Sequence, residues 1–302
     1  MSLRKFLVLL IVFGCFAVRA EAKKAGTPGY DAIYVFGDSF SDVGNIFVAT
    51  RGATPAAPYY KGRFSDGPIW LDHVASAWGL PMEPSLLGGT NYAFGGARVL
   101  SAAGSIPSVP QQAALYLAQH GGKADPKALY VIEGGSNDIF ASILVGSPQT
   151  LGHDIAVGLV KAMTLLREAG AKNFLVPNVL NAGLAPKLSP FPKAVADFAT
   201  AATVAANGKL TELLADQEGR DDVHVHRVDL FGVTGAIVAD ATHFGFTDIT
   251  HPCLDAVKHT VCADPARTLF WDTVHPTEFG HAISAATVVA SLSPLLSADD
   301  EQ

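Results

Sequence analysis

The sequence predicts an α/β domain in which helices cover both faces of a parallel β-sheet. Short runs rich in β-branched and aromatic residues alternate with longer amphipathic segments, which is the pattern of strand–helix–strand units. The chain of 302 residues is 49% hydrophobic and 16% charged, which supplies enough apolar surface for a large core. No linker or internal repeat divides it, so we expect a single domain over residues 23–302.

The predicted elements follow in order along the chain. Five segments have strand character, the second of them weakly: residues 32–36, 90–93, 129–133, 173–177 and 223–228. Amphipathic periodicity places helices at residues 69–78, 109–120, 150–169 and 192–215, with a last helix after Pro276. Together they predict a five-stranded parallel sheet.

Residues 1–22 have the features of a signal peptide. Arg4 and Lys5 precede an apolar run over residues 6–18, and small residues stand at Ala20 and Ala22. The run is too short to span a bilayer, so we expect cleavage after Ala22 and a secreted or periplasmic protein.

Charge limits the partners of the exported chain. Cleavage after Ala22 would remove three cations and one anion and shift the formal net charge from −7 to −9. Such an acidic protein is repelled by phosphate backbones, which argues against a nucleic-acid partner. Nothing in the sequence indicates an obligate protein partner.

The three cysteines divide between the leader and one short segment. Cys15 lies in the leader, where it weakly resembles an acylation site and offers a lipid-anchored form as the alternative to a free protein. Cys253 and Cys262 remain, and an oxidising compartment favours a disulfide between them. The nearby His251 and His259 offer a zinc site as the rival interpretation, but paired Cys-x-x-Cys spacing is missing. We therefore expect the disulfide and no metal.

Three long segments lack regular periodicity. Residues 51–68 are rich in glycine and proline and carry Tyr59, Tyr60 and Phe64. This segment is expected either to border a substrate groove, even as a lid, or to be an ordinary surface loop with buried aromatic residues. Residues 181–191 and 241–268 can form further rims of a pocket.

In an open parallel sheet, the ligand-binding or catalytic residues are expected just beyond the carboxyl ends of the strands. Gly37-Asp38-Ser39 follows the first strand, a glycine pair at 95–96 follows the weak strand, and residues 134–138 (GGSND) follow the next. Residues 271–276 (WDTVHP) stand before the last helix. Each motif alone is typical of a helix cap or turn, but their joint arrangement favours one site.

These motifs supply the parts that acyl transfer requires. Ser39 offers a hydroxyl nucleophile, and His275 offers an imidazole base, the side-chain type whose unperturbed pKa lies nearest neutrality. Asp272, three residues before His275, can accept from the imidazole and fix its tautomer. The backbone N–H of Ser39, a glycine N–H of the second motif and the Asn137 amide can bind the oxyanion.

At these residues the chain resembles the SGNH (GDSL-type) hydrolases over nearly its whole exported length. The family's four blocks are similar to residues 36–45 (FGDSFSDVGN), 91–97 (NYAFGGA), 135–138 (GSND) and 272–275 (DTVH). Residues 62–68 (GRFSDGP) also resemble a stretch of the family, in which asparagine is more usual than Asp66. Phe40 stands where the family name has leucine, a swap expected to leave the turn intact.

The resemblance implies a flavodoxin-like three-layer α/β/α sandwich and an ester hydrolase that needs no cofactor. It implies Ser39 as nucleophile with Asp272 and His275, and Ser39, Gly96 and Asn137 as oxyanion donors. Gly96 is chosen from its distance to Asn91, and Gly95 is the fallback. The substrate is expected to be a small-molecule or lipid ester, with a lipid interface as an option.

Two rival functions are weighed against an esterase or lipase. Relatives that the chain resembles also act on phospholipids or transfer acyl groups to alcohols, so both activities stay open. A non-catalytic surface-binding module predicts that a triad member is missing, and none is. The ordinary α/β-hydrolases are disfavoured, because Ser41 stands where their Gly-x-Ser-x-Gly elbow needs glycine.

Overall fold

A computed structural model describes residues 29–220 and 222–296. The predicted signal peptide and Cys15 lie outside the described residues. The central sheet has four parallel strands in the order β1-β2-β3-β4. They are β1 (Ile33–Phe36), β2 (Leu129–Ile132), β3 (Asn173–Pro177) and β4 (His224–Val228). Four of the five predicted strands are therefore confirmed.

The predicted fifth strand, at residues 90–93, is wrong as a strand. Asn91 forms only isolated parallel bridges, with Val35 of β1 and with Pro84. The pairing with β1 is short. The N–H of Val35 donates to the carbonyl of Thr90 and the N–H of Tyr92 donates to the carbonyl of Val35, but the next donor of the ladder, the N–H of Gly37, donates to the side chain of Gln112 instead. The bridge lies beside β1, where a flavodoxin-like strand order would place this segment.

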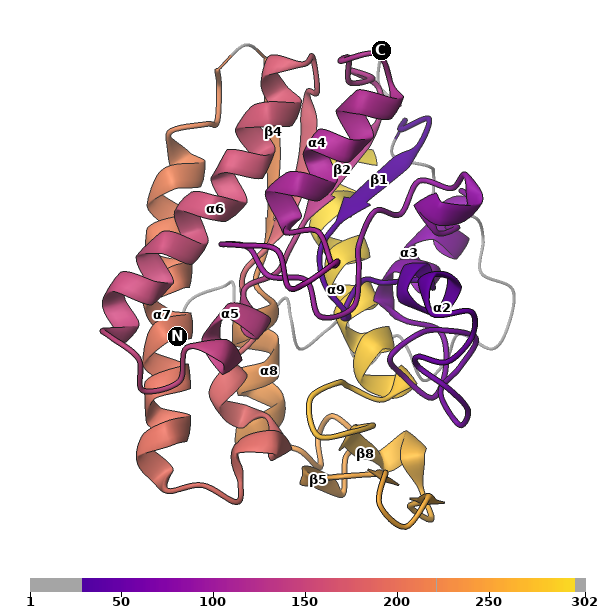
Figure 1. The fold of residues 1–302 in the computed structure, drawn as a ribbon, viewed down its shortest axis with the longest axis vertical. Coiled ribbons are helices and arrows are strands. Elements are labelled where there is room, and N and C mark those ends of the chain that lie inside the picture. Colours follow the sequence, from indigo (N-terminus) through magenta and orange to yellow (C-terminus); the bar gives the residue numbers. More distant parts are fainter. Residues whose placement is uncertain (1–28, 221, 297–302) are drawn as a thin grey trace.

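Helices cover both faces of the sheet (Figure 1). The longer ones are α3 (Trp70–Trp78), α4 (Val109–Gln119), α6 (Pro148–Glu168), α7 (Lys193–Ala215), α8 (Leu230–Ala239) and α9 (Glu278–Leu296). The shorter ones are α2 (Asn45–Ala49) and α5 (Ser136–Ala141), and 3₁₀ turns occur at Ser85–Leu87, Ala182–Leu184, Pro186–Leu188 and Pro265–Arg267. The five predicted helices are present, with ends shifted by at most two residues, whereas α2, α5 and α8 were not predicted.

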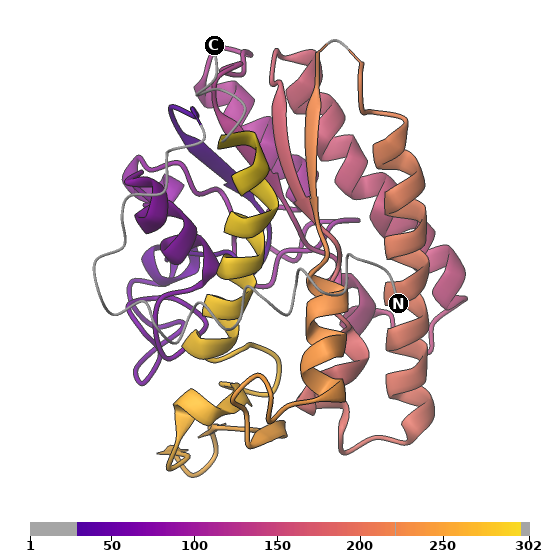
Figure 2. The same ribbon diagram turned by 180° about the vertical axis from the view of Figure 1, so that it is seen from behind.

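Successive side chains of each strand point to opposite faces of the sheet, so the hydrophobic core is divided into two clusters. Tyr130 and Ile132 of β2 face the cluster built from α4, α6 and α7, while Leu129 and Val131 face the cluster built from α3 and α9. All four side chains are at most 1% exposed. Strand β2 is buried at every position and forms a continuous apolar run in the sequence, which is why it could be located from the sequence. Figure 2 shows α9 crossing the sheet on the face opposite α4 and α6.

Residues 240–271 form a small extension below the carboxyl end of the sheet (Figure 1). It contains a parallel pair, β5 (Asp248–Pro252) with β8 (Thr268–Phe270), and an antiparallel hairpin, β6 (Leu254–Asp255) with β7 (Thr260–Val261). Within the described ranges, none of the helices is both long and apolar enough to cross a membrane.

Candidate active site

The turn after β1 is fixed by a side chain from α4 and one from the end of β2. Gln112, fully buried on α4, accepts from the N–H of Gly37 at 2.8 Å and donates to its carbonyl at 2.9 Å. The N–H of Asp38 donates to Glu133 Oε1 at 2.7 Å. A Cβ on Gly37 would lie 1.9 Å from that same oxygen, so any larger residue would displace the Glu133 carboxyl group that holds the turn. The turn presents Ser39 at the carboxyl end of the sheet, 8% exposed.

A second turn, between β8 and α9, carries Asp272 and His275. Asp272 Oδ1 accepts from the backbone N–H groups of Val274 and His275, both at 2.7 Å. This cap curls the turn so that His275 Nδ1 lies 2.7 Å from Asp272 Oδ2. His275 Nε2 then lies 2.7 Å from Ser39 Oγ, across 236 residues of sequence. The structure thus brings together three residues that the sequence named.

Protonation states follow from this geometry. Burial raises the pKa of Asp272, but the adjacent His275 and the hydrogen bonds from His275 and Val274 outweigh burial and lower the pKa to about 2. The ionised carboxylate can only accept, so His275 Nδ1 carries a proton and donates it. In neutral His275 the Nε2 lone pair is then free to accept from the Ser39 hydroxyl.

Residues 51–68 contact this chain of hydrogen bonds. The Tyr59 hydroxyl donates to Asp272 Oδ2 at 2.8 Å, and the Phe64 ring lies 5.1 Å from the His275 ring. Ser65 Oγ donates to the carbonyl of Pro276 at 3.1 Å. The sequence marked Tyr59 and Phe64 as loop aromatics, but it gave no sign that their partners lie more than 200 residues away.

Backbone hydrogen bonds distinguish the two glycines of the second motif. The N–H of Gly95 donates to Asp42 Oδ2 at 2.8 Å and is therefore occupied. Gly96 adopts φ +79°, and no hydrogen bond engages its N–H among the described residues. This geometry favours Gly96 over Gly95 as a donor to a ligand. A Cβ on Gly95 would lie 2.4 Å from the Phe64 ring, which also keeps that position glycine.

Asn137, on the first turn of α5, extends its amide toward the other two motifs. Its Nδ2 donates to the carbonyl of Ala97 at 2.9 Å and to Asp38 Oδ2 at 3.3 Å. The next residue, Asp138, accepts from the N–H groups of Val99 and Leu100 at 2.7 and 3.0 Å. These contacts fasten the GSND motif to the glycine loop.

Two buried carboxyl groups lie behind the nucleophile turn. Asp38 is 4% exposed and Glu133 8% exposed. Burial raises the pKa of Asp38 to about 6, and burial together with Asp38 raises the pKa of Glu133 well above its ordinary value. Carboxyl groups so close in an apolar surrounding resist joint ionisation. Glu133 and Gln112 were missed from the sequence, because their partner is backbone that only the fold brings near.

A largely apolar cavity of about 820 Å³, open mouth included, begins at Ser39. Its walls come from α5, the 180–185 segment, α8, β8 and the start of α9, and they include Phe140, Leu184, Val233, Ile237 and Leu269. Asp38 and His275 are the charged or titratable residues of the wall, and both adjoin Ser39: Asp38 precedes it in the sequence and His275 contacts its hydroxyl. Of the two segments predicted as rims, residues 181–191 contribute Asn181, Ala182, Leu184 and Ala185 to the wall, and residues 241–268 contribute none. Helix α8 was not predicted.

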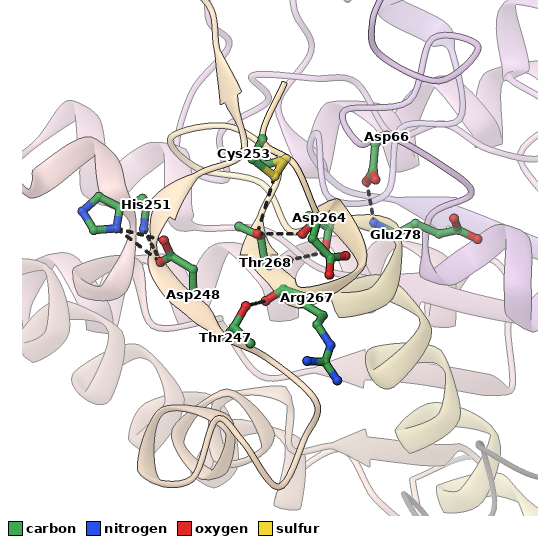
Figure 3. Close-up of a disulfide and its surroundings, with 11 residues drawn as sticks. Asp66, Thr247, Asp248, His251, Cys253, Asp264, Arg267, Thr268 and Glu278 are labelled. Carbon is green, nitrogen blue, oxygen red and sulfur yellow. Dashed lines mark hydrogen bonds and ion pairs between the residues drawn. A yellow bond between two sulfur atoms is a disulfide. The ribbon is translucent and has the colours of Figure 1, made fainter. Parts of the chain in front are cut away.

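The predicted disulfide is confirmed. Cys253 and Cys262 are joined and close the β6–β7 hairpin, which Figure 3 shows together with Thr268, whose Oγ1 lies 3.6 Å from Cys262 Sγ. The zinc interpretation fails because both thiols are used. His251 instead pairs with Asp248 at the surface, and the described residues contain no group of three side chains placed to bind a metal.

Comparisons with known proteins identify the family of the chain. The family profile described as GDSL-like Lipase/Acylhydrolase matches residues 33–288. The thermolabile hemolysin of Vibrio parahaemolyticus is 26% identical over 87% of this chain and 64% of its own length. Lipase 1 of Photorhabdus luminescens is 31% identical over 54% of this chain and 24% of its own length. The phosphatidylcholine-sterol acyltransferase of Aeromonas hydrophila is 24% identical over 96% of this chain and 98% of its own.

The chain therefore spans less than two thirds of the hemolysin and about a quarter of Lipase 1. The family profile, in contrast, covers β1 through most of α9, including each of the motifs that meet at Ser39. This chain belongs to the GDSL-like lipase/acylhydrolase family.

Proposed function

We propose that the protein is an exported serine hydrolase that cleaves carboxylic esters through an acyl-enzyme on Ser39. The observation that carries the proposal is the hydrogen-bonded chain from Ser39 Oγ through His275 to Asp272, with both links at 2.7 Å. A nucleophile, a base and a group that orients the base are the parts that acyl transfer needs.

The proposed reaction has two halves. Ser39 Oγ attacks the ester carbonyl as its proton passes to His275 Nε2, and the tetrahedral oxyanion accepts from the N–H groups of Ser39 and Gly96 and from the Asn137 amide, which exchanges its 3.3 Å contact with Asp38 for the oxyanion. His275 then protonates the departing alcohol, leaving an acyl ester on Ser39. Water, deprotonated by His275, attacks this ester and releases the carboxylic acid and the serine hydroxyl. Asp272 stays ionised throughout and stabilises the imidazolium.

The cavity beside Ser39 supports an aliphatic acyl group as the part of the substrate that is recognised. Its wall includes apolar side chains such as Phe140, Val233 and Ile237. Each buried methylene contributes about 0.8 kcal/mol, so a chain that fills this wall gains affinity over an acetyl group.

The test uses Ser39→Ala and a series of p-nitrophenyl esters from acetate to palmitate. Ser39→Ala should remove turnover of every ester with an unchanged melting curve, and turnover near the parent rate would refute the mechanism. If the parent protein itself hydrolyses none of these esters, the result would instead favour a non-catalytic binding module.

A matched pair on α8 tests the cavity. Ile237 lines it, whereas the next residue, Val238, is 40% exposed. Ile237→Trp should lower kcat/KM for octanoate at least tenfold more than for acetate, because the indole fills the acyl wall. Val238→Trp should change both alike. Equal effects of the two variants would contradict this placement of the acyl chain.

Acyl transfer is the second candidate, and it is favoured by the full-length match to the Aeromonas acyltransferase. Both activities share the acyl-enzyme and differ in whether water or an alcohol attacks it. Adding an alcohol acceptor during turnover, with phosphatidylcholine as donor, separates them: a new ester product marks transfer, and free fatty acid alone marks hydrolysis.

Export is proposed with cleavage after Ala22. The disulfide supports it, since exported proteins usually keep such bonds. Mass measurement of protein recovered from the medium or periplasm tests it, because a mature chain that begins at Lys23 is expected and an uncleaved or lipid-modified chain would contradict it.

A further inference from the structure

We propose that Tyr59 is a positioning residue of the triad, which sets through Asp272 the pH range in which His275 can act as a base. The inference rests on the proposed function. Its Oη donates to Asp272 Oδ2 at 2.8 Å, the same oxygen that accepts from His275 Nδ1 at 2.7 Å. The carboxylate that faces the imidazole therefore has a second donor from the 51–68 segment.

With this contact, each oxygen of the Asp272 carboxylate accepts two hydrogen bonds. Its Oδ1 accepts two backbone N–H groups and its Oδ2 accepts the imidazole and the phenol. Burial, reinforced by the neighbouring carboxylate, raises the pKa of Tyr59 above its ordinary value, so the phenol stays protonated at any working pH. The hydroxyl is thus a permanent donor and never competes with His275 as a base.

The Tyr59 ring is held by the same residues that hold the turn. It meets Trp271, directly before Asp272, edge to face at 6.0 Å, and meets Phe64 edge to face at 6.3 Å. Phe64 in turn lies against the His275 ring. Trp271 is 2% exposed and packs with Cys253 and Leu254 of the disulfide hairpin. The hydroxyl therefore approaches Asp272 from a fixed direction.

The expected effect on the chemistry has a definite sign. A hydrogen bond from Tyr59 draws negative charge density on Oδ2 away from the imidazole. Without it, the carboxylate favours the imidazolium more strongly, and His275 holds a proton up to a higher pH. A protonated Nε2 cannot accept from Ser39, so the acid limb of the pH profile moves upward. The freed carboxylate also has more rotational freedom, which lowers the rate at any pH.

Other titratable groups act on the same imidazole. Asp38 lies behind the nucleophile turn and favours the charged imidazole. The fully buried His281 of α9 is stacked on Phe40, and burial holds its pKa well below the ordinary value, so it is neutral at the working pH and adds no charge. Neither of them contacts Tyr59 in the structure described. Their effects are therefore common to the parent and to a variant at Tyr59, and a comparison of the two isolates the phenol.

The experiment compares Tyr59→Phe with Tyr60→Phe in the full mature chain. Tyr60 is the adjacent tyrosine, and its ring faces Lys61 instead of the triad. Profiles of kcat/KM for p-nitrophenyl butyrate are recorded from pH 5 to 9. Tyr59→Phe should shift the acid limb upward by about half to one pH unit and lower the pH-independent kcat about tenfold, whereas Tyr60→Phe should do neither. KM should change less than kcat, because Tyr59 does not line the cavity.

A purely structural role would lower activity and melting temperature without moving the limb, and that outcome overturns the inference. Tyr59→Leu guards against a packing effect, because it lacks the ring as well. This variant should melt at a lower temperature than Tyr59→Phe, and the acid limb of its pH profile should be shifted by the same amount. The proposed function is checked separately: if Ser39→Ala stays active, the triad itself is wrong, whereas an inactive Ser39→Ala with an unmoved Tyr59→Phe limb rejects only the role of Tyr59.

Discussion

Replacing Asp272 by asparagine removes the charge of the triad while keeping its shape. The carboxylate accepts four hydrogen bonds, two on each oxygen, and an amide offers a single acceptor oxygen. If the amide oxygen stays with the backbone N–H groups of Val274 and His275, the NH₂ group faces the imidazole. His275 Nδ1 must then accept, its proton moves to Nε2, and Nε2 can no longer receive the proton of Ser39.

The loss can be estimated from these contacts. Two hydrogen bonds to a charged group, from His275 and Tyr59, are lost, and each contributes about 1.5–3 kcal/mol. The sum, about 3–6 kcal/mol, corresponds to a decrease of about 10²–10⁴ in kcat. The tautomer change adds to the same step, so we expect the upper part of this range, as for the corresponding substitution in other serine hydrolase triads.

The assay is steady-state turnover of p-nitrophenyl butyrate at pH 7.5, with thermal unfolding as the measure of folding. Asp66→Asn is the matched control. Asp66 Oδ1 accepts the N–H of Glu278 at the start of α9, shown in Figure 3, and an asparagine oxygen can replace it. We expect this control to keep kcat within about twofold and to lose about 0.3–1 kcal/mol of stability from the helix dipole. Asp272→Asn with more than a tenth of the parent kcat would refute the reasoning.

Three further outcomes are expected. Asn137→Ala should lower kcat for a short-chain ester about 100- to 1,000-fold with a small change in KM, because one oxyanion donor is lost, and kinetics near the parent would contradict that role. Burial, with His224 nearby, lowers the pKa of His226 to about 4. Between pH 6.5 and 4 the unfolded chain therefore binds a proton at this histidine that the folded chain does not bind, so the free energy of unfolding decreases as pH falls. Urea titrations of His226→Gln should therefore show the slope of unfolding free energy between pH 5 and 6 reduced by up to about 1.4 kcal/mol per pH unit, and an unaltered slope would argue against it. Replacing Cys253 and Cys262 by serine should cost about 2–3 kcal/mol, because the loop that they close spans only nine residues, and an unmoved urea midpoint would show that the bond contributes nothing.

The parts of the fold that the sequence predicted well are those in which burial is decided locally. Strand β2 is apolar at each position from Leu129 to Ile132, so its pattern needs no tertiary information. Helix α8 was missed because it is apolar almost all round and lacks the polar stripe that marks an amphipathic helix. Residues 90–93 were mistaken for a strand because the bond from the Gly37 N–H to Gln112, which interrupts their pairing with β1, leaves no trace in hydrophobic periodicity.

The named members of the candidate site could be predicted because each lies in a short motif with a chemical reason for its spacing. Asp272 and His275 are three residues apart, which is the distance over which one turn returns a carboxylate to an imidazole. Gln112, Glu133 and Tyr59 could not be found in this way. Each of them acts on a partner at least 75 residues away, so only the packed sheet reveals the contact.

The separation of 236 residues between Ser39 and His275 has a consequence for folding. The two side chains meet only after β1 has paired with the later strands and the segment before α9 has closed against them. Contacts of such long range are the slow ones in a folding reaction, since the entropy of closing the intervening chain must be overcome first. Esterase activity should therefore recover more slowly after dilution from urea than the helical circular dichroism signal. The rate of its recovery then measures the last step of folding, in which His275 reaches Ser39.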